Sequence, residues 1–405
     1  MTNTETSPSQ IINIESLSFV NGAHLLLKKA LRELPAGARL GVRADTPDFA
    51  VHLRGWCRAQ GHEFLADETG SVTAWIIRSV TNGRWKDAER AGASDPFALN
   101  SVQALPSSQW GFAARGAMVE AGGPTFHYPL NEKALVWADN APKLYAQAVA
   151  AQWNPNTAIN WDMPFVLEDD VENAVVQVMT YLIENENAAL QVPAKFIANI
   201  HPHFREVLQL LAIQIADEAR HIEVFTRRAT LHGKPLGLST VSAQQSLKTL
   251  LDEPDFALAS FLLSVLGEGT FLNLLWFLEH HAPDPVTRQI ARLVVQDEAR
   301  HVAFGVGHLQ YQLASDPSLR ERLAMAMNRR HDALANTAGL NEEVFDALIL
   351  LAAGSWQPEK IAEGFAKVQT LKTEMHAGRK SRLQKLGFKT EEAEELSALH
   401  TRNFM

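Results

Sequence analysis

The chain has 405 residues, with 46 acidic and 37 basic side chains, a formal net charge of −9 and a single cysteine. The acidic balance and the dispersed basic residues argue against non-specific nucleic-acid binding, which needs a concentrated basic surface. Because Cys57 stands alone, the sequence excludes an internal disulfide, a multi-cysteine zinc site and an ordinary iron–sulfur cluster. A bound metal must therefore use His and carboxylate ligands.

The protein is expected to be soluble and cytoplasmic, without a membrane partner. No stretch approaches the roughly eighteen uninterrupted apolar residues that a membrane span requires. The N-terminus, Met1-Thr-Asn-Thr-Glu-Thr, lacks the basic patch and apolar run of a secretory signal. The length of the chain predicts two domains of unequal size.

Residues 1–80 are predicted to form a small α/β domain, because strand and helix patterns alternate there. Ile11-Ile-Asn-Ile and Arg39-Leu-Gly-Val-Arg-Ala indicate strands, and a helix is expected between them from Gly22. A second helix is predicted from Pro47 to Gly61, with Pro just inside its start and Gly at its end. Two further strands are expected near residues 63–65 and 72–77.

Residues 81–138 are predicted to be a linker that wraps the larger domain. The segment is rich in Gly, Pro, Ser and Asn, including Gly122-Gly-Pro, so regular structure is poorly specified. Helical periodicity then dominates from residue 171 to about residue 375. Residues 139–405 are therefore expected to form an all-α domain with a C-terminal helical extension, and its broad helix faces make a homodimer plausible.

An internal repeat is the strongest feature of the sequence. Asp217-Glu-Ala-Arg-His221 recurs as Asp297-Glu-Ala-Arg-His301, each time after a long apolar helical run. Glu and His three residues apart project from one helix face and can bind one metal ion. A four-helix di-metal site also needs one inward Glu from each of the other two helices.

Both additional carboxylates can be found upstream of the repeats. Glu268 lies 30 residues before Glu298 on an apolar helical stripe, where a carboxylate needs a partner. Glu186 lies 32 residues before Glu218 and is chosen over Glu184, because Glu186 shares its stripe with apolar residues. The predicted metal ligands are Glu186, Glu218, His221, Glu268, Glu298 and His301. This oxygen and nitrogen set suits two iron ions, with manganese or a mixed Mn/Fe pair as the alternative.

Residues around the ligands have predicted supporting roles. Asp217 and Asp297 could each accept a hydrogen bond from the free imidazole nitrogen of a ligating His. Arg220 and Arg300 are assigned to structural pairing with carboxylates. A charged helix face laced with salt bridges would explain one copy of the repeat, but two copies with matching upstream Glu residues favour metal.

Two glycines flank Glu268 and are pocket candidates. Gly267 and Gly269 each weaken a helix, so something must compensate for their presence. One hypothesis is space beside the metals for dioxygen and substrate, and the other is close contact with a neighbouring helix. The two hypotheses have equal weight. On the other half, Asn185 and Asn187 flank Glu186 and suggest a filled, polar side.

The repeat and its upstream Glu residues resemble the ferritin-like di-iron carboxylate superfamily, and the oxygenases and oxidases in particular. The resemblance implies a mainly α fold, a ferritin-like four-helix bundle with extra helices, preceded by the small α/β domain. It also implies a non-haem di-iron oxidoreductase that activates O₂ to oxygenate or oxidise a small organic substrate, with electrons from a separate reductase. The alternatives are an iron-handling ferroxidase or storage protein and a di-manganese enzyme that scavenges peroxide.

The first domain resembles the TusA sulfur-carrier family in Leu25-Leu-Leu-Lys-Lys-Ala-Leu and in Trp56-Cys followed by Gly61-His-Glu-Phe. That family carries persulfide on a cysteine before its first helix, and Val20 stands at the matching position of this chain. Cys57 lies in the second helix instead. The domain is therefore interpreted as a docking or regulatory module.

Overall fold

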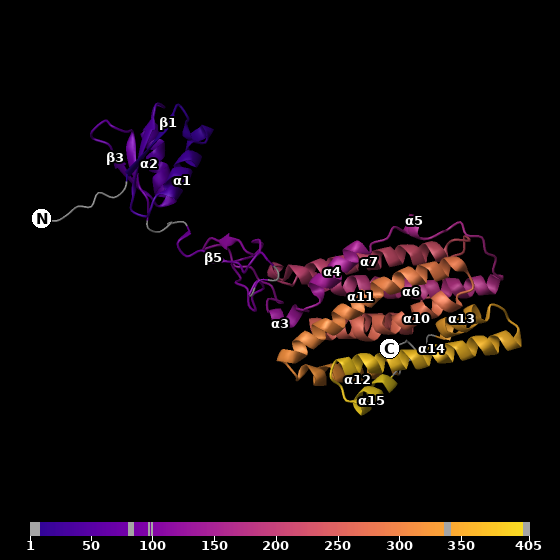
Figure 1. The fold of residues 1–405 in the computed structure, drawn as a ribbon. Helices are drawn as coiled ribbons and strands as arrows, with labels where there is room; N and C mark the ends of the chain where they lie inside the picture. The colour runs from indigo at the N-terminus through magenta and orange to yellow at the C-terminus, as the bar shows by residue number, and fades with distance from the viewer. Residues whose placement is uncertain (1–8, 80–84, 96–97, 99, 336–341, 400–405) are drawn as a thin grey trace. The chain divides into compact units, whose positions relative to one another are not determined.

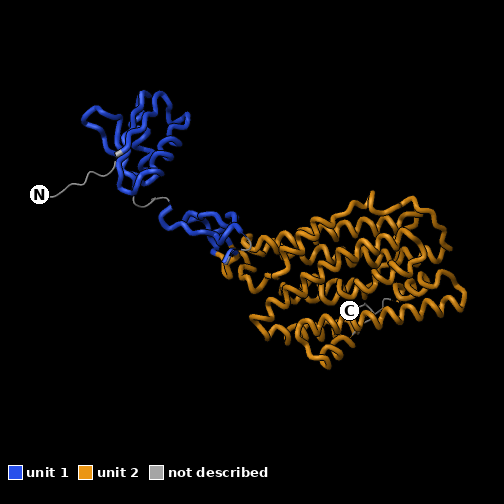
Figure 2. Tube along the Cα trace, in the orientation of Figure 1, with its two compact units in different colours: residues 1–101, 107–126 blue, residues 102–106, 127–405 orange. Residues whose placement is uncertain are grey.

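The structure is a computed structural model that describes residues 9–79, 85–95, 98, 100–335 and 342–399 (Figure 1). Contacts divide the chain into two compact units, residues 1–101 with 107–126 and residues 102–106 with 127–405 (Figure 2). The N-terminal segment on which the secretory-signal prediction rests lies mostly outside the described residues. The domain boundaries at residues 80 and 138 stay predictions.

Unit 1 contains a four-stranded sheet in the order β1-β2-β4-β3. Its strands are β1 (Ser9–Glu15), β2 (Arg39–Ala44), β3 (Glu63–Ala66) and β4 (Ala74–Ile77), and its helices are α1 (Ala23–Glu33) and α2 (Phe49–Gln60). β1 runs parallel to β2, and β4 pairs antiparallel with both β2 and β3. α1 makes the crossover between the parallel strands, which is the α/β arrangement that the sequence predicts.

The core of this sheet domain includes its single thiol. α1 buries Ala23, Leu27 and Leu31, whose spacing places them on one helix face. Cys57 on α2 is fully buried, and burial raises the pKa of its thiol to about 12. A protonated, inaccessible thiol is inert. Val20, at the position of the TusA-family cysteine, is 95% exposed and carries no such group.

The described part of residues 85–126 consists mainly of turns and bends. Its regular structure is one short antiparallel pair, β5 (Glu89–Arg90) with β6 (Met118–Val119). This agrees with the low content of regular structure that the Gly and Pro residues predict.

Four long helices form the centre of unit 2 (Figure 1). They are α6 (Asp169–Ile197), α7 (Arg205–Ala229), the helix Phe256–His281 that includes α10 (Gly269–His281), and α11 (Pro285–Ser315). α6 packs along α7, α10 packs along α11, and α7 contacts α11. The short connections between paired helices suit antiparallel neighbours of a bundle.

Shorter helices precede and surround this bundle. They are α3 (Lys133–Val136), α4 (Ala141–Ala150), α5 (Pro155–Ala158), α8 (Val241–Asp252), α12 (Leu319–Ala335), α13 (Glu342–Ala353), α14 (Pro358–Lys385) and α15 (Thr390–Ala398). α4 packs on α7, α13 packs on α6, and α14 packs on both α10 and α13. The C-terminal helices α13 and α14 therefore pack on the bundle.

The apolar core of unit 2 is divided into two clusters. Along α6, Ile183 belongs to one cluster and Ala189 belongs to the other. The buried Glu186 lies between them. On α11, the first cluster extends past the buried Glu298 to Val302, and Phe304 belongs to the second. A polar layer thus crosses the middle of the bundle, and it lies where the sequence predicts the metal ligands.

The third central helix is not uniform. α9 (Phe256–Ser260) continues into a π-helix, Phe261–Glu268, labelled η4, and then into α10. The apolar sequence predicts a helix here but carries no signal for the wider turn. Among the described residues, Phe256–His281 is the one helix long and apolar enough to cross a membrane, and 83% of its apolar window is buried. Such burial is what a core helix of a bundle shows.

A buried ion cluster ties three helices together at one end of the bundle. Arg228 on α7 is fully buried and donates to Glu172 on α6 at 2.6 Å. It also donates to Asp284 at 2.9 Å. Asp284 is in turn the N-cap of α11, because its side chain accepts the amide of Thr287 at 2.8 Å. One guanidinium therefore pairs with two buried carboxylates, and one of these carboxylates caps the start of α11.

Arg228→Met should strongly destabilise unit 2, because the change leaves two buried carboxylates without their cation. The expected loss in the free energy of unfolding is about 3–5 kcal/mol, as measured by urea titration of the helical circular-dichroism signal. Lys248→Met is the control, since Lys248 forms an exposed pair with Asp252 on α8. Equal, small effects from both variants would contradict the structural role of Arg228.

Candidate metal centre

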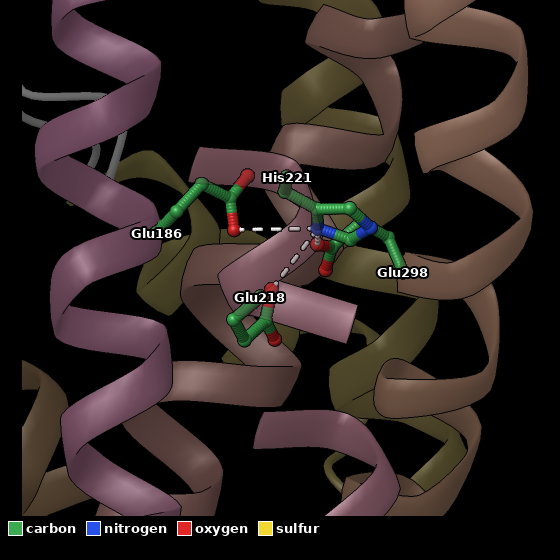
Figure 3. Close-up of side chains that lie close together, drawn as sticks. All are labelled: Glu186, Glu218, His221 and Glu298. Atoms are coloured by element: carbon green, nitrogen blue, oxygen red, sulfur yellow. Dashed lines mark hydrogen bonds and ion pairs between the residues drawn. The ribbon is translucent and has the colours of Figure 1, made fainter. Parts of the chain in front are cut away.

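All six predicted ligands meet in the polar layer of the bundle. α6 supplies Glu186, α7 supplies Glu218 and His221, the end of the π-helix supplies Glu268, and α11 supplies Glu298 and His301. Figure 3 shows the side chains of four of them, Glu186, Glu218, His221 and Glu298, pointing toward one another. The neighbouring Glu184 is only half-buried and does not join this cluster.

The six residues form two overlapping groups, and within each group the ligand atoms lie within 4.8 Å of one another. The first group contains Glu186, Glu218, His221 and Glu298, and the second contains Glu218, Glu268, Glu298 and His301. Glu218 and Glu298 belong to both groups. Each group offers three carboxylates and one imidazole, so the cluster can hold two ions with two shared carboxylates.

The shared carboxylates direct one oxygen toward each histidine. Glu218 places Oε2 at 3.1 Å from Nδ1 of His221 and Oε1 at 3.1 Å from Nδ1 of His301. Glu298 places Oε1 at 3.3 Å from Nδ1 of His221 and Oε2 at 3.5 Å from Nδ1 of His301. Both imidazoles therefore present Nδ1 to the cluster, and this atom would be the metal-binding nitrogen.

Unsatisfied atoms at the centre of the cluster fit a metal pair. Oε2 of Glu268 and Oε2 of Glu298 are buried and have no hydrogen-bond partner among the described residues, and the contact of Oε1 of Glu218 with Nδ1 of His301 at 3.1 Å lacks hydrogen-bond geometry. No ligand residue is more than 5% exposed. Four carboxylates so close together, out of reach of water, require compensating positive charge. Two divalent cations would supply that charge and occupy the unsatisfied atoms.

The pKa values of Glu186 and Glu268 reflect the crowding of buried carboxylates. Burial, followed by the charges of Glu218 and Glu298, raises the pKa of Glu186 well above its usual value. Burial and the charge of Glu298 likewise raise the pKa of Glu268. Without a metal, the cluster therefore retains protons that an incoming cation has to displace.

The aspartates of the repeat hold the histidines, but in crossed pairs. Nε2 of His221 lies 3.2 Å from Asp297, and Nε2 of His301 lies 3.3 Å from Asp217. The predicted role of Asp217 and Asp297 is thus consistent with the structure, while the partner is the histidine of the other copy. The crossing arises because α7 and α11 contact each other with their repeats at the same level.

The outer side of the histidines is closed by a polar network. Trp153 donates its indole N–H to Asp297 at 2.8 Å, and Gln152 donates to Asp217 at 2.8 Å. Arg220 donates to Asp297 at 2.8 Å and also pairs with Asp217. Arg300 is hydrogen-bonded to Asp297 as well. The structural assignment of Arg220 agrees with these contacts.

Sequence reasoning did not find Gln152 and Trp153 as site residues. They follow the end of α4, far along the chain from both repeats, and only their folded position brings them to the aspartates. Gln214 was also missed. Its amide donates to Oε1 of Glu268 at 3.1 Å. Gln214 lies three residues before Asp217, and Val294 occupies the same place before Asp297, so the two halves of the site differ here.

A small cavity of about 20 Å³ lies on the side of the cluster away from the histidines. It is lined by Asn185, Glu186, Ala189, Leu250, Leu263, Gly267, Glu268, Phe271 and Glu298. Most of this lining is apolar, and Asn185 is the member of the pair Asn185 and Asn187 that lines it. Asn187 is exposed, while Asn185 donates to the carbonyl of Tyr181. The volume is sufficient for a molecule about the size of water or dioxygen.

The two pocket candidates have different surroundings. Gly267 lines the cavity, which agrees with the hypothesis of space beside the metals. Gly269 instead faces α14, where a Cβ atom would lie 2.4 Å from Nε of Arg382. The pocket hypothesis is therefore wrong for Gly269, and the alternative of close helix contact applies there.

Asp297→Asn should weaken metal binding about 10- to 100-fold, because the neutral amide orients and polarises His221 less strongly. Anaerobic titration with Fe(II) or Mn(II) against a competing chelator measures the affinity. Asp252→Asn, at an exposed position on α8, is the matched control and should bind metal as the wild type does. Wild-type affinity in the Asp297 variant would contradict the role given to this aspartate.

Comparison with protein families agrees with the predicted resemblance of unit 1. Residues 23–78 match the family model described as Sulfurtransferase TusA. This segment covers α1, β2, α2, β3 and β4 of the sheet domain. No curated protein matches the chain.

Solved structures resemble the helical part of the chain. An R2-like ligand-binding oxidase, in a tyrosine-to-phenylalanine variant with an anaerobically reconstituted Mn/Fe cofactor, matches with a TM-score of 0.50 and 19% identity. The match covers 62% of this chain and 94% of that chain. A glycine-to-leucine variant of this oxidase with an Fe/Fe cofactor has a TM-score of 0.47, with 19% identity and the same coverage. The first likeness shows the fold: a ferritin-like helical bundle, preceded in this chain by a TusA-like α/β domain.

Proposed function

We propose that the bundle binds two metal ions, two irons or one manganese and one iron, and activates dioxygen to oxidise a small organic molecule. The observation that carries the proposal is the pair of overlapping ligand groups, which share Glu218 and Glu298 beside a small apolar cavity. The fold neighbour with a TM-score of 0.50 is an R2-like ligand-binding oxidase with a Mn/Fe cofactor, which supports the same metals here.

Each ligand has a distinct place in this proposal. Glu186 and His221 would hold one ion and Glu268 and His301 the other, while Glu218 and Glu298 belong to both groups and would contribute to both positions. Two adjacent ions of this kind supply Lewis acidity and the electrons that reduce dioxygen. Four carboxylates balance the four positive charges of two divalent cations, so the loaded site would be close to neutral.

The two sides of the cluster have different roles in this proposal. On the histidine side, Asp217 and Asp297 orient both imidazoles. Arg220 bonds Asp297 there, so this side of the cluster would be closed to dioxygen. On the opposite side, Ala189, Leu263 and Phe271 line the cavity and keep water away from the ligands. Dioxygen therefore reaches the ions from the cavity side, at the face bordered by Glu186, Glu268 and Glu298.

The cavity also limits the substrate. At about 20 Å³ it admits dioxygen, but an organic molecule requires movement of Phe271, Leu250 or Leu263. An apolar lining favours an apolar reacting group at the metals. The proposal also includes a separate reductase as the electron donor and the cytoplasm as the location of the protein.

Oxygen uptake by the reduced, iron-loaded protein tests the proposal. Ala189→Leu fills the cavity, so its rate of oxygen consumption should fall at least about tenfold while its metal content stays at the wild-type value. Ala150→Leu, on the exposed end of α4, is the matched control and should react as the wild type does.

Several outcomes would contradict the proposal. A wild-type rate in the metal-loaded Ala189 variant would exclude the cavity as the place of oxygen entry. No oxygen uptake by the iron-loaded wild type would contradict dioxygen activation at this site, and elution of the protein as a very large cage would favour iron storage. Rapid breakdown of peroxide by a manganese-loaded form would favour the peroxide-scavenging alternative.

A further inference from the structure

The ligand Glu268 is the last residue of the π-helix Phe261–Glu268. A π-helical turn is rare and less favourable than an α-helical one, so surrounding contacts have to stabilise it. The backbone hydrogen bonds at its end are irregular, because the N–H of Gly269 is shared among the carbonyls of Ser264, Leu266 and Gly267. The direction of Glu268 therefore depends on what holds this turn in place.

Arg382 of α14 contacts the turn directly. Its Nε donates to the carbonyl of Val265 at 2.7 Å, three residues before Glu268. Arg382 is only 8% exposed, and no carboxylate among the described residues lies within salt-bridge range of it. A buried cation without an anionic partner is costly, and Arg382 instead donates to this backbone carbonyl of the π-helix.

Gly269 makes the contact sterically feasible. A Cβ atom at this position would lie 2.4 Å from Nε and 2.6 Å from Cζ of Arg382. Any other residue at 269 would push the guanidinium away from the helix. Gly269, directly after Glu268, thus leaves room for Arg382, which lies more than one hundred residues later in the chain.

We propose that Arg382 is a positioning residue for the metal ion bound by Glu268 and His301. By holding the carbonyl of Val265, Arg382 fixes the π-helical turn and thereby aims Glu268 into the cluster. The ion bound by Glu186 and His221 has no ligand on this helix. The C-terminal helix α14 therefore sets the affinity of one metal position and leaves the other unaffected. This inference rests on the proposed two-metal function.

The test compares stepwise metal binding in the full chain. Arg382→Met keeps the length of the side chain but removes its donors, and Gly269→Ala displaces the guanidinium by an independent route. Both variants should bind the first Mn(II) as the wild type does and the second at least about tenfold more weakly. In electron paramagnetic resonance, the coupled two-manganese signal should give way to the six-line signal of a single ion.

Two further variants separate positioning from general stability. Arg382→Lys restores a donor that can reach the Val265 carbonyl, so it should recover second-ion binding at least in part. Arg330→Met removes another buried arginine, which bonds Ser246 on α8, and should lower the melting temperature yet retain both ions. Melting curves ensure that all variants are compared while folded.

The outcomes also separate this inference from the proposed function. If Arg382→Met and Gly269→Ala bind two ions with wild-type affinities, the inference is wrong and the two-metal function stands. If both variants lose the two ions equally, Arg382 has only a general structural role and the inference is also wrong. If the wild type binds no ions, the proposed function itself fails.

Discussion

The fold of unit 2 depends on the compensation of four carboxylates that the bundle places in its own core. Glu186, Glu218, Glu268 and Glu298 interrupt an otherwise apolar interior, and none is more than 5% exposed. Such a layer is unfavourable unless positive charge lies among the oxygens. Metal binding would therefore be coupled to folding, since a cation that neutralises this layer would also stabilise the bundle.

Around this layer, the structure combines repetition with a few breaks in symmetry. The two copies of the repeat cross, because the aspartate of each holds the histidine of the other. This exchange ties α7 to α11 and makes both metal positions depend on both helices. Symmetry is broken at Glu268, which receives a hydrogen bond from Gln214 and ends a π-helix, whereas Glu186 lies in a regular helix. Two ions in these positions would have different surroundings, as a mixed metal pair requires.

The ligands could be predicted from sequence because their signals are local. Glu and His three residues apart share a helix face, and Glu186 is separable from Glu184 by the apolar stripe around it. The supporting residues could not be predicted this way. Trp153, Gln214 and Arg382 reach the site only through tertiary packing, and no local pattern marks the π-helical turn. The sequence offers two explanations for Gly269, space beside the metals or close helix contact. Gly269 faces Arg382, which favours close contact, and Arg382 lies too far along the chain for periodicity to relate the two residues.

Six residues of the bundle are proposed to bind two transition-metal ions. Anomalous X-ray diffraction from crystals of the metal-loaded protein, recorded at the iron and manganese absorption edges, tests it most directly. Two anomalous peaks are expected inside the cluster, one beside Nδ1 of His221 and one beside Nδ1 of His301, with Glu218 and Glu298 between them. A single peak would contradict the bridging roles of these carboxylates, and a cluster without any peak would mean that the repeated motif is purely structural.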